Sequence, residues 1–203
     1  MQEKELEPFS AQLEKWLKSD KPKTVANLNE VFAEKSLAII ILVLMFLPAL
    51  PLPTGGISHV FEIIAMLVSL QLVIGLRTIW IPKRWEHMKI RGLGEKKAIN
   101  FMVRRIKWLE KFSRPRFSYL MRSRAGLAFV GLFLFAYSLA AFLSPPFSGL
   151  DTLPSMGVVI MALSLILEDA AILLAGIVTG AGGVALIVGA GAIITSLFHH
   201  LHF

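Results

Sequence analysis

The most constraining feature of this 203-residue sequence is a stretch of 79 residues, 125–203, that contains no lysine or arginine. A soluble protein would have to bury all of this apolar surface, whereas a lipid bilayer accepts it directly. The preceding stretch, 77–124, holds 15 of the 21 basic residues against only three acids. This contrast predicts an integral membrane protein with one basic loop. The ionisable side chains of the apolar stretch are Asp151, Glu168, Asp169, His199, His200 and His202.

The composition also limits the chemistry. Hydrophobic residues make up 55% of the chain and charged residues 17%, against about 45–50% and about 25% in soluble domains. The absence of cysteine excludes disulfides, thiolate nucleophiles and cysteine-based metal sites. No glycine-rich phosphate loop, nucleophile elbow or paired metal-ligand motif is present. We therefore expect no cofactor and no metal site, the terminal histidines included, and the leading interpretation is not an enzyme.

The charge pattern divides the chain into four regions: a polar segment 1–35, a first membrane half 36–82, a basic loop 83–124 and a second membrane half 125–203. In the polar segment, "PFSAQLEKWLKS" places four apolar side chains at helical spacing, namely Phe9, Leu13, Trp16 and Leu17. This spacing predicts a short amphipathic helix. Such a helix either lies at the membrane interface or packs on its own protein.

The apolar segments differ in length. Residues 37–53, "LAIIILVLMFLPALPLP", are divided by Pro48 and fall short of the roughly 20 residues of a full span. Residues 57–76 and 125–146 are each long enough to cross a membrane. Residues 154–198 suffice for two crossings, with candidate breaks at Glu168-Asp169 and at "TGAGG".

Two Pro/Gly-rich segments interrupt the apolar runs. Irregular backbone survives in hydrocarbon only inside protein or beside water. These segments are therefore either ordinary turns in the headgroup zone or re-entrant tips that dip inward. The candidate helix breaks are Pro48, Pro51, Pro53, Gly55, Gly56, Pro145, Pro146 and Pro154.

The two halves of the chain resemble each other. "EKWLKSDKPK", "SLAIIILVLMF", "PLPTGG" and "AMLVSLQL" are followed in the same order by "IKWLEKFSRPR", "GLAFVGLFLFA", "SPPFSG" and "IMALSLIL". The pattern predicts an all-α membrane protein of two related halves, with broken, re-entrant helices and interfacial amphipathic helices. The repeats are parallel if 36–76 crosses twice and inverted if its first segment is re-entrant. The short first segment favours the inverted alternative.

The basic loop contains "AINFMVRRIKWLEKF", in which the apolar residues share one helical face opposite Arg104, Arg105 and Lys107. This pattern is typical of a helix lying in the membrane interface. Because the charge sits between membrane segments, we expect the loop to be cytoplasmic and to contact anionic lipids rather than nucleic acid. The apolar face consists of Ile99, Met102, Val103, Ile106 and Leu109.

Few residues could carry chemistry. Glu62 lies inside an apolar segment, and His59 lies three residues earlier on the same helical face, so the pair could relay protons or hydrogen-bond each other. Glu168 and Asp169 have no basic residue nearby in sequence, which makes them the stronger candidates for ion coupling. Arg77 follows the end of a predicted span and either reaches the headgroups or pairs with an acid of the other half.

Small residues recur at every fourth position near the C-terminus. Gly176 and Gly180 form one such pair, and Ala181, Ala185 and Gly189 form a series. Small residues at this spacing allow helices to approach closely. The contacts lie either within the chain or between two copies in a homodimer.

Three segments resemble the exopolysaccharide synthesis ExoD family: "LPLPTGGIS", "SLQLVIGLRTIWIPKRW" and "LPSMGVVIMALSLILEDAAILLAG". The resemblance covers about residues 8–195. It implies a bacterial inner-membrane protein linked to exopolysaccharide production and, in some rhizobia, to growth in alkaline medium. It implies no catalytic residues.

These observations favour a transporter-like, ion-coupled membrane protein that supports exopolysaccharide synthesis or export and pH tolerance. One alternative is a membrane enzyme acting on a lipid-linked carrier. Another is a non-catalytic accessory subunit that contacts exopolysaccharide assembly proteins through the basic loop.

Overall fold

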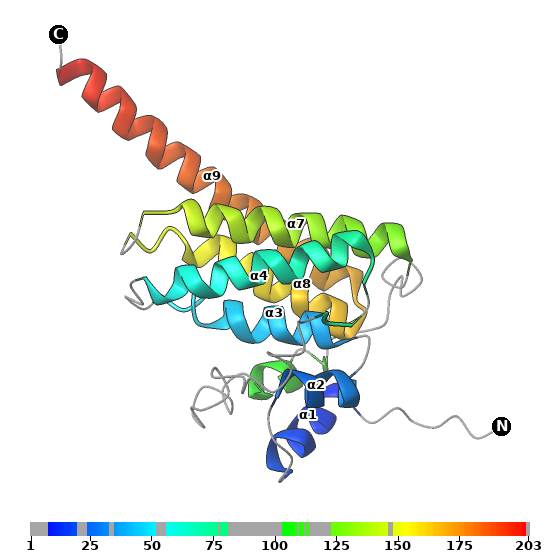
Figure 1. Ribbon diagram of the computed structural model, residues 1–203. Coiled ribbons are helices and arrows are strands. Elements are labelled where there is room, and N and C mark those ends of the chain that lie inside the picture. The colour runs from blue at the N-terminus through cyan, green and yellow to red at the C-terminus, as the bar shows by residue number, and fades with distance from the viewer. Residues whose placement is uncertain are drawn as a thin grey trace.

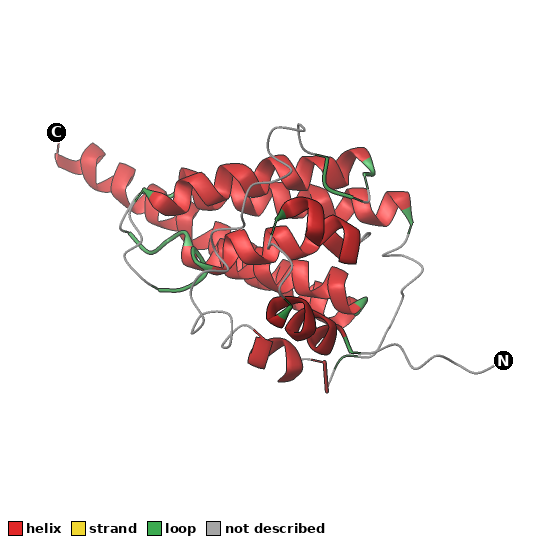
Figure 2. Ribbon diagram, turned by 60° about the horizontal axis from the view of Figure 1, so that its bottom comes forward, coloured by secondary structure: helices red, strands yellow, loops and turns green. Residues whose placement is uncertain are grey.

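Helices make up the regular structure of the part of the chain that the computed structural model describes (Figure 2). The described residues are 8–19, 24–32, 35–51, 56–76, 78–80, 103–108, 110–111, 113, 123–145 and 148–201. The helices are α1 Phe9–Lys18, α2 Val25–Phe32, α3 Ser36–Phe46, α4 Ile57–Ile74, α7 Arg124–Leu143, α8 Thr152–Leu167 and α9 Ala170–Leu201. Residues 103–108 and 110–111 are also helical.

Five apolar helices, α3, α4, α7, α8 and α9, form a bundle in which consecutive helices run in opposite directions (Figure 1). Two contacts fix the antiparallel register of α4 and α7. Gly131 lies against Ser69 and Leu72, while the rings of His59 and Phe142 are 5.4 Å apart at the other end. The α3–α4 and α7–α8 connections therefore lie at one end of the bundle, and the α4–α7 connection leaves from the other.

This direction of the helices decides between the two arrangements predicted for the halves. An inverted relationship would place the α3–α4 and α7–α8 connections at opposite ends. Both lie at the same end (Figure 1), so the expectation that favoured the inverted alternative is wrong. The short first segment favoured the wrong arrangement because α3, although too short to span the membrane, still runs antiparallel to α4 as one arm of a hairpin.

Within the described residues, three helices are long and apolar enough to cross a membrane: Ile57–Ile74, Arg124–Leu143 and Ala170–Ile193. The other two apolar helices are shorter. At 1.5 Å per residue, the 11 residues of α3 extend about 16 Å, roughly half of a 30 Å hydrocarbon core. The chain is thus a helical membrane protein, and its second apolar half breaks at Glu168-Asp169. "TGAGG" lies inside the continuous helix α9 and is not a break.

The short and long apolar helices differ in how much of their surface is buried. The short helix α3 is buried on nearly every side, since seven of its apolar side chains are in the core: Leu37, Ala38, Ile39, Ile40, Ile41, Leu42 and Met45. The long helices instead expose one apolar stripe, which on α4 includes Val60, Leu67 and Ile74. Exposed leucines and valines are stable in lipid, so the exposed stripes face the bilayer and the short helices form the interior.

Glycines allow α8 and α9 to approach closely. A Cβ atom at Gly157 would lie 2.6 Å from the Cα atom of Gly180, and one at Gly176 would lie 2.9 Å from the backbone nitrogen of Met161. Such distances are too short for any side chain, so the helices pack backbone to backbone. The first of the two predicted small-residue patterns is thus a contact within the chain.

The N-terminal helices form a separate layer beneath α3 (Figure 1). The apolar side chains Phe9, Leu13 and Trp16 of α1 are buried, and the indole of Trp16 donates a hydrogen bond to Asn27 Oδ1 at 2.7 Å. Of the two interpretations of this amphipathic helix, packing on its own protein is confirmed. Residues 103–108 join the same layer by burying Val103 and Ile106.

Candidate functional site

Glu62 is the fully buried carboxylate of the helix bundle. The buried stripe of α4 repeats every three or four residues, which places Glu62 in line with apolar and serine side chains rather than on the lipid-facing stripe. A charged side chain inside a membrane span is costly, and such residues usually face the interior of the protein. The stripe consists of Ser58, Glu62, Ala65, Val68, Ser69 and Leu72.

His59 supplies one hydrogen-bond partner for Glu62. The distance between His59 Nδ1 and Glu62 Oε2 is 2.8 Å. The imidazole is partly exposed and packs edge-on against the ring of Phe142. Because neutral imidazole carries one N–H, this contact fixes the proton on Nδ1 when Glu62 is ionised, and it leaves Nε2 as an acceptor. The structure thus brings together the pair that helical spacing predicted.

The second oxygen of Glu62 is different. Oε1 is buried and has no hydrogen-bond partner among the described residues. Asp151, which precedes α8, lies close enough for its charge to act on Glu62. A buried polar group without a partner costs about 1–3 kcal/mol, and more when it is charged. Glu62 therefore has unused bonding capacity in the interior of the bundle.

Glu168 and Asp169 form the break between α8 and α9. Glu168 has a positive φ of 55°, and this left-handed residue ends α8. Asp169 Oδ1 accepts a hydrogen bond of 2.9 Å from the backbone N–H of Ala171, as the residue before a helix commonly does. Both acids therefore have structural partners at this turn.

A distant lysine also reaches the α8–α9 turn. Lys35 Nζ donates a hydrogen bond of 2.8 Å to the carbonyl of Ile166, and it lies 4.0 Å from Glu168 Oε1. A cation at a helix C-terminus is favourable because the last carbonyls have no partner within the helix. Lys35 precedes α3, so sequence distance concealed this partner. No local signal could have found it.

The predicted helix breaks have varied environments. Pro48 and Pro154 are buried, whereas Pro51, Gly56 and Pro145 are exposed. Pro154 packs tightly against Gly183 of α9, which explains its burial. Pro53, Gly55, Pro146 and Arg77 lie outside the described residues, as do Ile99, Met102 and Leu109 of the basic loop.

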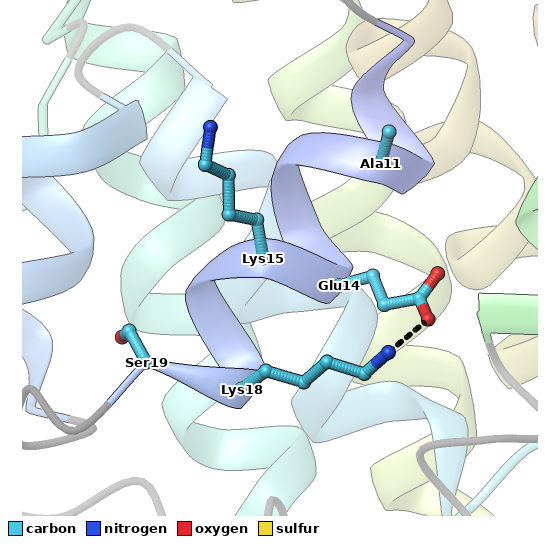
Figure 3. Close-up of a pocket in the computed structure, with 5 residues that line it drawn as sticks. All are labelled: Ala11, Glu14, Lys15, Lys18 and Ser19. Carbon is cyan, nitrogen blue, oxygen red and sulfur yellow. Dashed lines mark hydrogen bonds and ion pairs between the residues drawn. The ribbon is translucent and has the colours of Figure 1, made fainter.

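The N-terminal layer carries its own charge cluster. Glu14 of α1 pairs with Lys107 and, at 2.8 Å, with Lys18 (Figure 3). The hydrogen bond from Lys107, followed by that from Lys18, lowers the pKa of Glu14 from 4.5 to about 2. The cluster borders a shallow, open hollow lined by Ala11, Lys15 and Ser19. The pair Glu14–Lys107 joins α1 to the helical residues 103–108.

Metal ligands do not gather in the described part of the chain. No group of three or more histidine, aspartate or glutamate side chains is arranged there to hold a metal ion. The side chains of His199, His200 and His202 lie outside the described residues.

Comparisons with known proteins place this bundle in a family. The sequence model of "Exopolysaccharide synthesis, ExoD" matches residues 9–189. An uncharacterized protein of Synechocystis sp. is 32% identical over 170 residues, which cover 82% of this chain and 76% of that protein. No solved structure matches the chain. The matched region includes every apolar helix from α3 to most of α9, and the chain therefore belongs to the ExoD exopolysaccharide synthesis family.

Proposed function

We propose that this protein is a transporter-like, ion-coupled membrane protein that supports exopolysaccharide synthesis or export. The observation that carries the proposal is Glu62, a buried carboxylate with one bonded and one unbonded oxygen inside an apolar helix. Intramembrane carboxylates with this placement mark ion and proton pathways. A purely structural carboxylate would be expected to satisfy both oxygens.

The orientation in the bacterial inner membrane follows from the basic loop. Its 42 residues, 83–124, connect the C-terminal end of α4 to the N-terminal end of α7. Basic loops remain on the cytoplasmic side, where anionic lipids attract them. Exposed Arg104 and Arg105 at the described end of this loop support such a lipid contact. Glu62 then lies nearer the extracytoplasmic end.

The two halves support a repeat of parallel type within this architecture. Ser69 of α4 and Ser164 of α8 occupy matching positions in the aligned segments, and both are fully buried. Each hydroxyl donates a hydrogen bond to its own helix, at Ala65 and Met161 respectively. In such a repeat the short helix α3, which buried Pro48 follows, is the first arm of a hairpin that corresponds to α7 and α8.

Ion coupling would also account for the growth in alkaline medium that the family resemblance implies. A protein that exchanges protons for another cation across the inner membrane helps to hold the internal pH. The exposed series Ala181, Ala185 and Gly189 of α9, the helix whose C-terminal part extends beyond the bundle (Figure 1), is our candidate contact for a homodimer.

The test is ion flux into liposomes that contain the purified full-length protein, followed with an internal pH dye. We expect proton movement driven by an imposed pH or cation gradient, and its loss in Glu62→Gln. Glu14→Gln is the matched control because it removes a partly exposed carboxylate outside the candidate spans. Absence of flux in the wild-type protein under every gradient would contradict the proposal and favour a membrane enzyme or an accessory subunit.

A further inference from the structure

Four buried side-chain oxygens of the bundle lack a hydrogen-bond partner among the described residues. One is Ser36 Oγ, at the first residue of α3, and the other three are Glu62 Oε1 on α4, Ser138 Oγ on α7 and Ser155 Oγ on α8. Each of the three residues is fully buried. Buried hydroxyls normally bond to a carbonyl of their own helix, as Ser144 does to Ala140 and Ser164 to Met161. Ser36 begins α3 at its end away from the α3–α4 connection, whereas Glu62 lies near that connection, so we treat Glu62, Ser138 and Ser155 as a separate group.

The register of α4 and α7 places Ser138 opposite Glu62. Gly131 of α7 contacts the carbonyl of Ser69 on α4. Ser138 lies seven residues after Gly131, and Glu62 lies seven residues before Ser69, which is two turns in each helix. Because the helices are antiparallel, Ser138 and Glu62 lie at the same height in the bundle, each on the face of its helix that contacts the other helix.

A second set of contacts brings Ser155 to this level. Tyr137 of α7 and Gly157 of α8 both lie against Gly180 of α9. Their neighbours Ser138 and Ser155 are therefore at similar heights in the bundle. Gly157 faces α9, and Ser155, two residues earlier, lies on the opposite side of α8 and is fully buried. Ser155 is therefore directed away from α9, towards the interior of the bundle.

The chemistry of the three oxygens indicates the kind of ligand. One carboxylate balances one positive charge, and each serine hydroxyl offers lone pairs to a cation. His59 bonds Oε2 and so leaves Oε1 as the oxygen turned to a ligand. Among the described residues, His59 is the ionisable group that is hydrogen-bonded to Glu62.

We propose that Glu62, Ser138 and Ser155 bind one small monovalent cation, Na⁺ or H₃O⁺, between α4, α7 and α8. The proposal rests on the proposed ion-coupled function and names its ligand class. The carboxylate supplies the charge, and the two hydroxyl oxygens replace part of the water around the ion. Asp151 lies one turn from the site, towards the α7–α8 connection, and attracts cations to it.

The test measures ²²Na⁺ binding to the purified full-length protein, together with proton flux into liposomes. We expect saturable ²²Na⁺ binding that protons displace, its loss in Glu62→Gln, and an affinity about tenfold lower in Ser138→Ala and Ser155→Ala. Ser144→Ala and Ser164→Ala are the matched controls, because they remove buried hydroxyls of the same helices that already have partners. If the ion is H₃O⁺ alone, ²²Na⁺ does not bind, and the same two serine variants shift the pH dependence of flux.

The outcomes separate the two proposals. The cation site is overturned if Ser138→Ala and Ser155→Ala equal their control variants in both ²²Na⁺ binding and the pH dependence of flux. This conclusion holds even if flux still requires Glu62. Serine-dependent ²²Na⁺ binding without any flux upholds the site and overturns ion coupling. Size-exclusion profiles equal to wild type verify that each variant is folded.

Discussion

The two acidic positions of the apolar regions differ in how the protein satisfies them. At the α8–α9 turn, Asp169 caps the following helix and Lys35 reaches Glu168 and the end of α8. In α4, Glu62 has one partner, His59, and one oxygen with none among the described residues. The acids at the turn have partners that stabilise the ends of two helices. Glu62, inside a helix, has an oxygen that can still bind a ligand.

The largest expected effect separates the two positions by activity. Glu62→Gln should abolish complementation of exopolysaccharide production in a deletion strain, because the neutral amide cannot take up and release a cation. Asp169→Asn should complement within about twofold, since asparagine also caps helices. Protein levels measured by immunoblot serve as the control. Loss of complementation in Asp169→Asn at normal protein levels would place the essential acid at the turn instead.

Removal of the cap should affect stability rather than activity. Asp169→Ala eliminates the hydrogen bond to Ala171 and should lower the free energy of unfolding by about 1 kcal/mol. Thermal unfolding in detergent, compared with Asp169→Asn, measures this loss. A change equal in both variants would mean that the charge, not the cap, stabilises the turn.

Lys35→Met should have a smaller effect on the same turn. The substitution removes the hydrogen bond to Ile166 and the contact with Glu168. Because the lysine side chain is 39% exposed, water replaces part of the interaction, and the loss should stay below about 1 kcal/mol. Lys35→Arg provides the control. Destabilisation as large as that of Asp169→Ala would show that the lysine is more strongly coupled to the bundle than its exposure indicates.

The smallest effect concerns the layer outside the membrane helices. The pKa of Glu14 is lowered to about 2, so its contribution is complete above pH 4.5 and is lost as the pH falls towards 2. The protection of the α1 amides from hydrogen exchange, relative to the unfolded chain at the same pH, should therefore fall over this range in wild type. In Glu14→Gln the α1 amides should exchange without this added pH dependence. High salt should reduce the difference, because the pairs are at the surface.

Sequence alone predicted the long helices and the pair His59–Glu62, since both depend on spacing within one helix. It also predicted the break at Glu168-Asp169 and the buried face of α1. It did not predict Lys35 at that break, because the contact joins residues 131 positions apart. It also missed Ser138 and Ser155, because serines in apolar helices give no signal until the register of neighbouring helices is known.

The most direct test of the difference between Glu62 and the turn acids is labelling with dicyclohexylcarbodiimide. This apolar reagent modifies carboxyl groups that take up a proton in apolar surroundings. Mass spectrometry of the protein in native membranes should find Glu62 modified, with protection by added Na⁺ or by raised pH, and Glu168 and Asp169 unmodified. Modification of Glu168 or Asp169 without modification of Glu62 would contradict the account.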